Sequence, residues 1–168
     1  MQLWIFYGRA GAGKSFVGRV CADEWGFQVY DGDRDLTPDM QRALREQRIF
    51  TDDMRVEFTA VLSRGIRERW ESGSKSSGSG LAVCSALFKL RDRKQLQRDF
   101  PQARLIWVRA SESVIETRLQ KRIGHLASSS YARLVNHGFE PPELASDVLD
   151  NDGDRERIVE QLRAYLRR

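Results

Sequence analysis

The sequence is poor in cysteine and histidine, and it contains no long apolar run. Only 2 cysteines and 2 histidines occur among its 168 residues. Cys21 and Cys84 both lie in apolar segments and lack the spacing of metal ligands, which predicts buried thiols and excludes a disulfide-rich or zinc-stapled fold. No apolar stretch approaches the ~20 residues that a membrane-spanning helix needs. Because Met1 leads directly into the first predicted strand, without a secretory signal pattern, we expect a cytoplasmic protein with no membrane contact.

The charge is close to balanced. The sequence has 28 basic and 24 acidic side chains, which gives a net charge of +4. The basic residues are dispersed and do not form the aromatic-interleaved track that single-strand binders use. This pattern favours small anionic ligands and leaves nucleic acid as the less favoured partner. The length predicts one domain over residues 1–168, acting as a monomer or a homodimer.

A glycine-rich stretch near the start of the chain carries the clearest motif. It matches the phosphate-binding pattern G-x-x-x-x-G-K-[ST] with Gly8, Arg9, Ala10, Gly11, Ala12, Gly13, Lys14 and Ser15. An apolar run precedes the motif and apolar residues at helical spacing follow it, as the motif requires. Glycines let backbone N–H groups turn toward a polyphosphate, and the following helix adds its positive end. We expect the whole motif to bind ATP, with Lys14 on the outer phosphates and Ser15 on Mg²⁺.

Strand patterns alternate with helical patterns along the chain. Apolar runs predict strands at 3–7, 27–30, 81–84, 104–108 and 147–150. Helical patterns lie at 14–25, 38–47, 51–70, 90–99 and 111–122, in part of 128–142, and from 154 onward. This alternation predicts an α/β fold, a three-layer α/β/α arrangement with a parallel sheet of about five strands. Ligands of such sheets bind at the carboxyl ends of the strands.

Two polar segments interrupt this pattern. Residues 72–80 have the composition of a flexible Ser/Gly loop, and a natural loop and an engineered linker both fit it. Residues of about 123–142 are predicted to form a small lid. Within the predicted helices, the charges at 90–99 indicate a solvated face. Ser111 or Ser113 is expected to cap the helix that follows the fourth strand, and Ser113 with Glu116 fits a capping box.

Two carboxylates follow the second predicted strand. Asp31 and Asp33 are two residues apart at its end, so both face the ligand crevice if the strand geometry continues. A kinase needs one carboxylate near the acceptor hydroxyl and another acidic group near hydrated Mg²⁺. An ordinary Asp-Gly-Asp turn is the alternative, and the nearby phosphate-binding motif favours the functional interpretation.

Three arginines are candidates for binding anions. Arg55 lies in the first turn of a predicted helix, where the helix dipole disfavours a cation. It therefore either pairs with Asp52 or Asp53, or binds an anionic substrate. Arg118 and Arg122 share one helix face and could close over the transferring phosphoryl group. A solvated basic helix end is the alternative for this pair.

The order of these motifs resembles the gluconate kinases and the wider group of shikimate-kinase-like small-molecule kinases. The resemblance rests on the phosphate-binding loop, Asp31-Gly32-Asp33, Thr51-Asp52-Asp53-Met54-Arg55, Cys84-Ser85-Ala86-Leu87 with Lys89, and Arg118-Leu119-x-x-Arg122-x-Gly124-His125. It implies a kinase that moves the γ-phosphoryl group of ATP to a sugar-acid hydroxyl.

The resemblance also implies roles for individual residues. Asp31 would lie near the metal and Asp33 near the acceptor hydroxyl, so that Lys14, Asp33 and Arg118 form the catalytic set. Arg55 would bind the substrate carboxylate, beside a pocket lined by Ser85 and Ala86. Arg118 and Arg122 would also contact ATP.

The segment after Asp33 departs from the family pattern. Family members usually carry His-Pro, a following Asn and Lys-Met there, whereas residues 34–40 contain neither the His nor the Asn. The residue after Gly124-His125 is commonly aromatic in the family and is Leu126 here. The ATP-binding half therefore matches the family, and the acceptor half differs from it.

Taken together, these features predict an ATP-dependent phosphotransferase that uses Mg²⁺ and acts on a small anionic metabolite such as a sugar acid. Two alternatives remain open at this stage. One is a kinase of nucleotides or of polynucleotide 5′-hydroxyl groups. The other is a non-enzymatic module whose ATP-bound state controls a partner.

Overall fold

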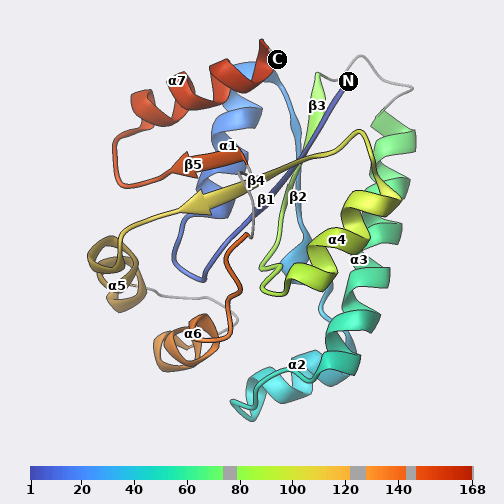
Figure 1. Cartoon of the computed structure of the whole chain (residues 1–168), viewed down its shortest axis with the longest axis vertical. Helices are drawn as coiled ribbons and strands as arrows, with labels where there is room; N and C mark the ends of the chain where they lie inside the picture. Colours follow the sequence, from blue (N-terminus) through green and yellow to red (C-terminus); the bar gives the residue numbers. More distant parts are fainter. Residues whose placement is uncertain (74–78, 122–127, 143–146, 168) are drawn as a thin grey trace.

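The computed structural model describes residues 1–73, 79–121, 128–142 and 147–167. Its centre is a five-stranded sheet in the order β2-β3-β1-β4-β5 (Figure 1). The strands are β1 (Gln2–Tyr7), β2 (Gln28–Asp31), β3 (Gly80–Cys84), β4 (Arg104–Arg109) and β5 (Asp147–Asp150). All four neighbouring pairs are parallel. The predicted α/β class and parallel sheet are confirmed.

Helices cover both faces of this sheet. They are α1 (Lys14–Trp25), α2 (Pro38–Arg45), α3 (Asp52–Gly73), α4 (Leu90–Asp99), α5 (Glu112–Gln120), α6 (Ser129–Asn136) and α7 (Arg155–Leu166), with a 3₁₀ turn at Gly32–Asp35. Helices α1 and α7 lie on one face, and α3 and α4 lie on the other (Figure 1). The arrangement is the predicted three-layer sandwich.

The alternation of side chains along β1 builds the two cores. Trp4 and Phe6 point into the cluster that includes α1 and α7, and Leu3 and Ile5 point into the cluster that includes α3 and α4. A central parallel strand buries both faces, which explains why β1 has an unbroken apolar sequence. The first cluster also contains Cys21 of α1 and Cys84 of β3, so the prediction of buried thiols is confirmed.

The carboxyl ends of the strands point to one end of the molecule. Helices α2, α5 and α6 lie at this end, below the sheet in Figure 1. Helices α5 and α6 join a third small core, in which Ile115 and Leu119 contact Ala132. The elements that surround a ligand in such a fold are therefore at the edge where the phosphate-binding motif ends β1.

Two local predictions are only partly confirmed. Ser111 occupies the N-cap position of α5, as one of the two expected alternatives. Ser113 lies inside the helix, and Glu116 is bound by Arg133 of α6 rather than closing a capping box. The charged helix α4 is not simply solvated, because Arg93 is buried and donates to backbone carbonyl groups in front of the helix.

The two polar segments are only partly described. Helix α3 continues to Gly73 and β3 begins at Gly80, so regular structure extends into both ends of the predicted loop at 72–80. Residues 74–78 lie outside the described residues. In the predicted lid, α6 confirms the short helix expected within 128–142. The lid residues 123–127, with Gly124 and His125, lie outside the described part of the chain.

Candidate active site

The phosphate-binding motif forms a tight turn between β1 and α1. Gly13 has φ +93°, in the left-handed region that other residues rarely adopt, and it caps the N-terminus of α1. Its neighbours leave no room for a side chain, because a Cβ atom here would overlap the Asn151 amide nitrogen. A Cβ atom at Gly8 would overlap the carbonyl oxygen of Val108 in the same way. These glycines are required by the close approach of the loop to the chain beneath it.

Lys14 is positioned by the loop that precedes it. Its side chain is only 8 % exposed, and Nζ donates to the carbonyl oxygens of Gly8 and Arg9 at 3.1 Å each. These two hydrogen bonds offset part of the free-energy cost of burying the ammonium group. The same side chain lines the cavity in front of the loop, so its charge is available to an anion there.

A cavity of about 580 Å³ extends from the phosphate-binding loop to the residues around Asp33 and Arg55. From the motif and α5, the described residues lining it include Ala10, Gly11, Gly13, Lys14, Ser15 and Arg118. From the other side, they include Asp31, Asp33, Leu36, Met40, Leu44, Phe50, Arg55, Phe58, Ala86, Phe88, Asp92 and Tyr131. Most of the predicted site residues therefore meet at one cavity.

Asp31 and Asp33 both line this cavity, but the strand geometry does not continue between them. Strand β2 ends at Asp31, and a 3₁₀ turn follows, in which the Asp33 backbone N–H donates to Asp31 Oδ1 at 3.3 Å. The Asp33 carboxylate is fixed separately. Its Oδ1 accepts hydrogen bonds from Ser85 Oγ and from the Ala86 N–H, both at 2.9 Å. Ser85 thus supports the carboxylate from behind, and Ala86 lies on the cavity wall.

Burial raises the pKa of Asp31, and the neighbouring charge of Asp33 raises it further. The folded protein therefore binds a proton at Asp31 more tightly than the unfolded chain does. It follows that ionised Asp31 costs stability at neutral pH, and that this cost disappears as the pH falls through the folded-state pKa. Such a cost is typical of carboxylates that are kept for function.

We predict that Asp31→Asn stabilises the protein at neutral pH. Asparagine keeps the oxygen that accepts from the Asp33 N–H and removes the buried charge. The melting temperature should rise by about 2–4 °C, the shift that 1 kcal/mol gives in a domain of this size, and the difference should shrink in mildly acidic buffer. Thermal unfolding without nucleotide at both pH values measures this. Glu57→Gln, an exposed change on α3, is the control, and a lower melting temperature for Asp31→Asn would contradict the prediction.

Arg55 lies at the opposite side of the cavity from the helix that carries Arg118, and its surroundings are unusual for a cation. The side chain is 8 % exposed, and its guanidinium lies 5.8 Å from the Phe50 ring centre and 6.0 Å from that of Phe88. Desolvation lowers its pKa, and the nearby Asp92 partly offsets this. Among the described residues no carboxylate forms an ion pair with Arg55. The predicted alternative of a pair with Asp52 is wrong, since Arg91 pairs with it instead.

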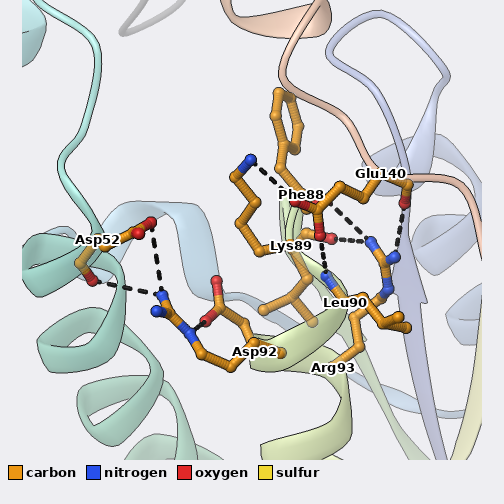
Figure 2. A network of polar contacts seen from close by, with 9 residues as sticks. Asp52, Phe88, Lys89, Leu90, Asp92, Arg93 and Glu140 are labelled. Atoms are coloured by element: carbon orange, nitrogen blue, oxygen red, sulfur yellow. Dashed lines mark hydrogen bonds and ion pairs between the residues drawn. The ribbon is translucent and has the colours of Figure 1, made fainter.

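A polar network holds the wall beside Arg55 (Figure 2). Arg93 donates to the carbonyl oxygens of Leu87, Phe88 and Glu140. Glu140 accepts from the Leu90 N–H at 2.8 Å and from Lys89 Nζ at 3.0 Å, which caps the start of α4. Arg91 bridges Asp92 and Asp52, both of which are labelled in Figure 2. The segment after α6 is thereby fastened to the loop that presents Phe88.

Arg118 contacts the phosphate-binding loop directly. Its Nη1 donates to the carbonyl oxygens of Gly11 and Ala12 at 3.4 and 3.2 Å, and its Nη2 donates to that of Asn151 at 2.8 Å. The solvated helix end considered for Arg118 is therefore wrong. Arg122, its predicted partner, lies outside the described residues. The expected contact of both arginines with ATP stays a prediction.

Two asparagines hold the loop and were not predicted from the sequence. Asn136 of α6 forms a pair of hydrogen bonds with Ala10, accepting from its N–H at 2.8 Å and donating to its carbonyl oxygen at 3.0 Å. Asn151, just after β5, is buried and donates from Nδ2 to the Ala12 carbonyl oxygen at 2.7 Å. Both asparagines fix the backbone of the loop through its carbonyl groups, and Asn136 also occupies the Ala10 N–H.

Comparisons with known proteins agree with this geometry, although no family model matches the chain. The thermosensitive gluconokinase of Escherichia coli K12 is 26% identical over 166 residues, covering 96% of this chain and 86% of that protein. The crystal structure of a gluconokinase from Sinorhizobium meliloti 1021 superposes with a TM-score of 0.78 at 25% identity, covering 99% of this chain and 91% of that one. A sugar kinase from Janibacter sp. HTCC2649 gives a TM-score of 0.82 at 21% identity, covering 99% and 95% of the two chains.

The chain is a small-molecule kinase with a P-loop kinase fold, and its sequence is similar to those of gluconokinases. The resemblance predicted from the order of motifs is confirmed, as are the fold class and the class of enzyme. A more distant neighbour, the Mycobacterium tuberculosis APS kinase at 16% identity and a TM-score of 0.67, shows the same fold.

The cavity of this kinase contains oxygen ligands suited to Mg²⁺. Ser15 and Asp31 both line it, and hydroxyl and carboxylate oxygens are ligands that Mg²⁺ accepts. Within the described residues no group of three or more histidine, cysteine or acidic side chains could hold a metal alone. That donor set fits an ion that binds through one or two protein oxygens together with nucleotide phosphates.

None of the helices described for the kinase is long and apolar enough to cross a membrane.

Proposed function

We propose that this kinase transfers the γ-phosphoryl group of ATP to a hydroxyl group of a small anionic metabolite, with a sugar acid as the model acceptor. The observation that carries the proposal is the single cavity that joins Lys14 with Asp33 and Arg55. A nucleotide and a small acceptor bound in this cavity could contact the ammonium group of Lys14, the carboxylate of Asp33 and the guanidinium of Arg55. The similarity to gluconokinases supports the choice of a sugar acid as the model.

On the nucleotide side, the backbone N–H groups of the loop and the ammonium group of Lys14 would bind the phosphates. Ser15 and Asp31 would hold Mg²⁺, which supplies positive charge that neutralises the phosphates when it is bound. Arg118 would shift from the loop carbonyl groups toward the phosphoryl group, with Arg122 completing the pair. Catalysis of this kind depends on positioning and charge stabilisation.

On the acceptor side, Asp33 would orient the attacking hydroxyl group and take its proton. Ser85 and the Ala86 N–H bind Oδ1, which leaves Oδ2 to face the substrate. Arg55 would bind the carboxylate of the acceptor. The separation of Arg55 from Asp33 would then fix how far the carboxylate lies from the reacting hydroxyl group. Closure of the 123–142 region over the cavity would exclude water and so limit ATP hydrolysis.

The test is acceptor-dependent release of ADP from Mg²⁺-ATP. We expect gluconate and related hydroxy acids to stimulate release, and nucleosides and 5′-hydroxyl oligonucleotides to give none. Stimulation by an oligonucleotide that weakens steeply with salt would instead support the polynucleotide kinase. ATP binding without stimulation by any acceptor would overturn the proposal in favour of a nucleotide-controlled module.

A further inference from the structure

The acceptor side of the cavity has a largely apolar wall. Leu36 precedes α2, and Met40 and Leu44 lie on it. Phe50 precedes α3 and Phe58 lies on it, facing the same space. These side chains extend the core cluster that packs α2 and α3 against the sheet, in which Met40 and Phe58 are buried. Met40 and Phe58 thus form the base of the wall, and the half-buried Leu36, Leu44 and Phe50 present most of its apolar surface to a ligand.

Three polar side chains on this side already form hydrogen bonds within the protein. Tyr131 donates from its hydroxyl to the Arg48 carbonyl oxygen at 2.9 Å. Asp33 Oδ1 accepts two hydrogen bonds, and Asp92 Oδ1 accepts from Arg91 Nε at 3.2 Å. A polyhydroxylated acid would bury several hydroxyl groups here, and each one left without a partner opposes binding. An acceptor with fewer hydroxyl groups avoids that cost.

Arg55 supplies the recognition of charge on this side. It is buried between the Phe50 and Phe88 rings, with no ion-pair partner among the described residues. Arg34, the other cation on this wall, is exposed and lies 3.6 Å from Asp31. A buried guanidinium without a paired carboxylate favours a ligand carboxylate, which it can bind with two parallel hydrogen bonds.

We propose that the preferred acceptor is a hydroxy acid with an apolar carbon body, such as a deoxygenated or methyl-branched relative of a sugar acid. Its carboxylate binds Arg55, its reacting hydroxyl group faces Asp33, and its alkyl carbons pack on Leu36, Met40 and Phe58. This inference rests on the proposed kinase activity and narrows its substrate class. It also gives a physical account of the segment at 34–40, which lacks the His and Asn usual in gluconate kinases and presents apolar side chains.

A matched pair of acceptors tests the inference. Pantoate and erythronate both have a four-carbon main chain with hydroxyl groups at the second and terminal carbons. They differ at the third carbon, which carries two methyl groups in pantoate and a hydroxyl group in erythronate. We expect kcat/KM to be at least about tenfold higher for pantoate, the discrimination that one or two buried methyl groups give. The neutral diol 2,2-dimethyl-1,3-propanediol lacks the carboxylate and should be a poor acceptor.

Substitutions test whether the apolar wall of the cavity and Arg55 determine the preference for pantoate. Leu36→Asn adds a polar group to the cavity and should lower the pantoate-to-erythronate ratio by about tenfold. Leu134→Asn, an exposed change on α6, is the matched control and should leave the ratio unchanged. Arg55→Gln should reduce turnover of both acids and leave the weak turnover of the diol unaltered.

The outcomes separate the inference from the proposed function. Efficient turnover of erythronate or gluconate, with pantoate equal or worse, overturns the inference and retains a sugar-acid kinase. An unchanged ratio in Leu36→Asn also overturns it, since the wall would then not select the acceptor. Failure of every hydroxy acid, in protein that Mg²⁺-ATP still protects against thermal unfolding, overturns the kinase proposal together with the inference.

Discussion

Replacing Lys14 with alanine is expected to lower kcat/KM for Mg²⁺-ATP by about 10²–10³-fold, the usual effect of removing one charge-stabilising group. Lys14 is the buried cation of the phosphate-binding loop, and its Nζ is already positioned by the Gly8 and Arg9 carbonyl groups. Its loss would remove the charge that we propose neutralises the transferring phosphoryl group. Steady-state release of ADP with a saturating acceptor measures the effect.

The control for Lys14→Ala is Lys94→Ala, which removes the same charge from an exposed position on α4. Far-ultraviolet circular dichroism should show that both variants are folded. Mg²⁺-ATP should raise the melting temperature of the Lys94 variant as much as that of the wild type, and should raise that of the Lys14 variant less. Activity of Lys14→Ala within about threefold of the wild type would contradict the assigned role.

The phosphate-binding loop could be predicted because its signals are local. Glycines supply the positive φ angles, and the Lys-Ser pair follows at fixed spacing before a helix. The start of α2 is equally local, since Thr37 Oγ1 accepts from the Met40 N–H and Pro38 occupies the first helical position. Such features depend on neighbours in the sequence and need no knowledge of the tertiary fold.

The pair of carboxylates was expected at the cavity for a geometric reason that is wrong. A continuing strand would place Asp31 and Asp33 on one face, but the chain turns after Asp31. A Cβ atom at Gly32 would overlap the Leu62 side chain of α3. The turn therefore depends on packing against α3, which begins 20 residues later in the sequence at Asp52. Sequence periodicity carries no information about such a contact.

The two asparagines that hold the loop were missed because their contacts are remote in sequence. Asn136 binds Ala10 across 126 residues, and Asn151 binds Ala12 across 139. Neither lies in a motif, and an asparagine in a polar segment is usually a surface residue. The burial of Arg93 was missed for the same reason, since it donates to the Glu140 carbonyl oxygen, 47 residues away in the sequence.

Asp33→Asn is expected to lower kcat by about 10²–10⁴-fold, the range for loss of a general base. Asparagine keeps an oxygen that can accept from Ser85 Oγ and the Ala86 N–H, so the position of the side chain should be preserved. It cannot take a proton from the acceptor hydroxyl group. KM for the acceptor should therefore change much less than kcat.

Asp35→Asn is the matched control for this change, because Asp35 lies in the same 3₁₀ turn and its carboxylate accepts from the Tyr30 hydroxyl instead. If the turn alone mattered, both variants would lose activity together. Steady-state kinetics over a range of acceptor concentrations separates kcat from KM for each. A large rise in KM with kcat retained in Asp33→Asn would make Asp33 a binding residue, and equal losses in both variants would assign the effect to the turn. Loss of kcat in Asp33→Asn alone would connect the carboxylate to the transfer step, since the two changes remove the same charge from positions two residues apart.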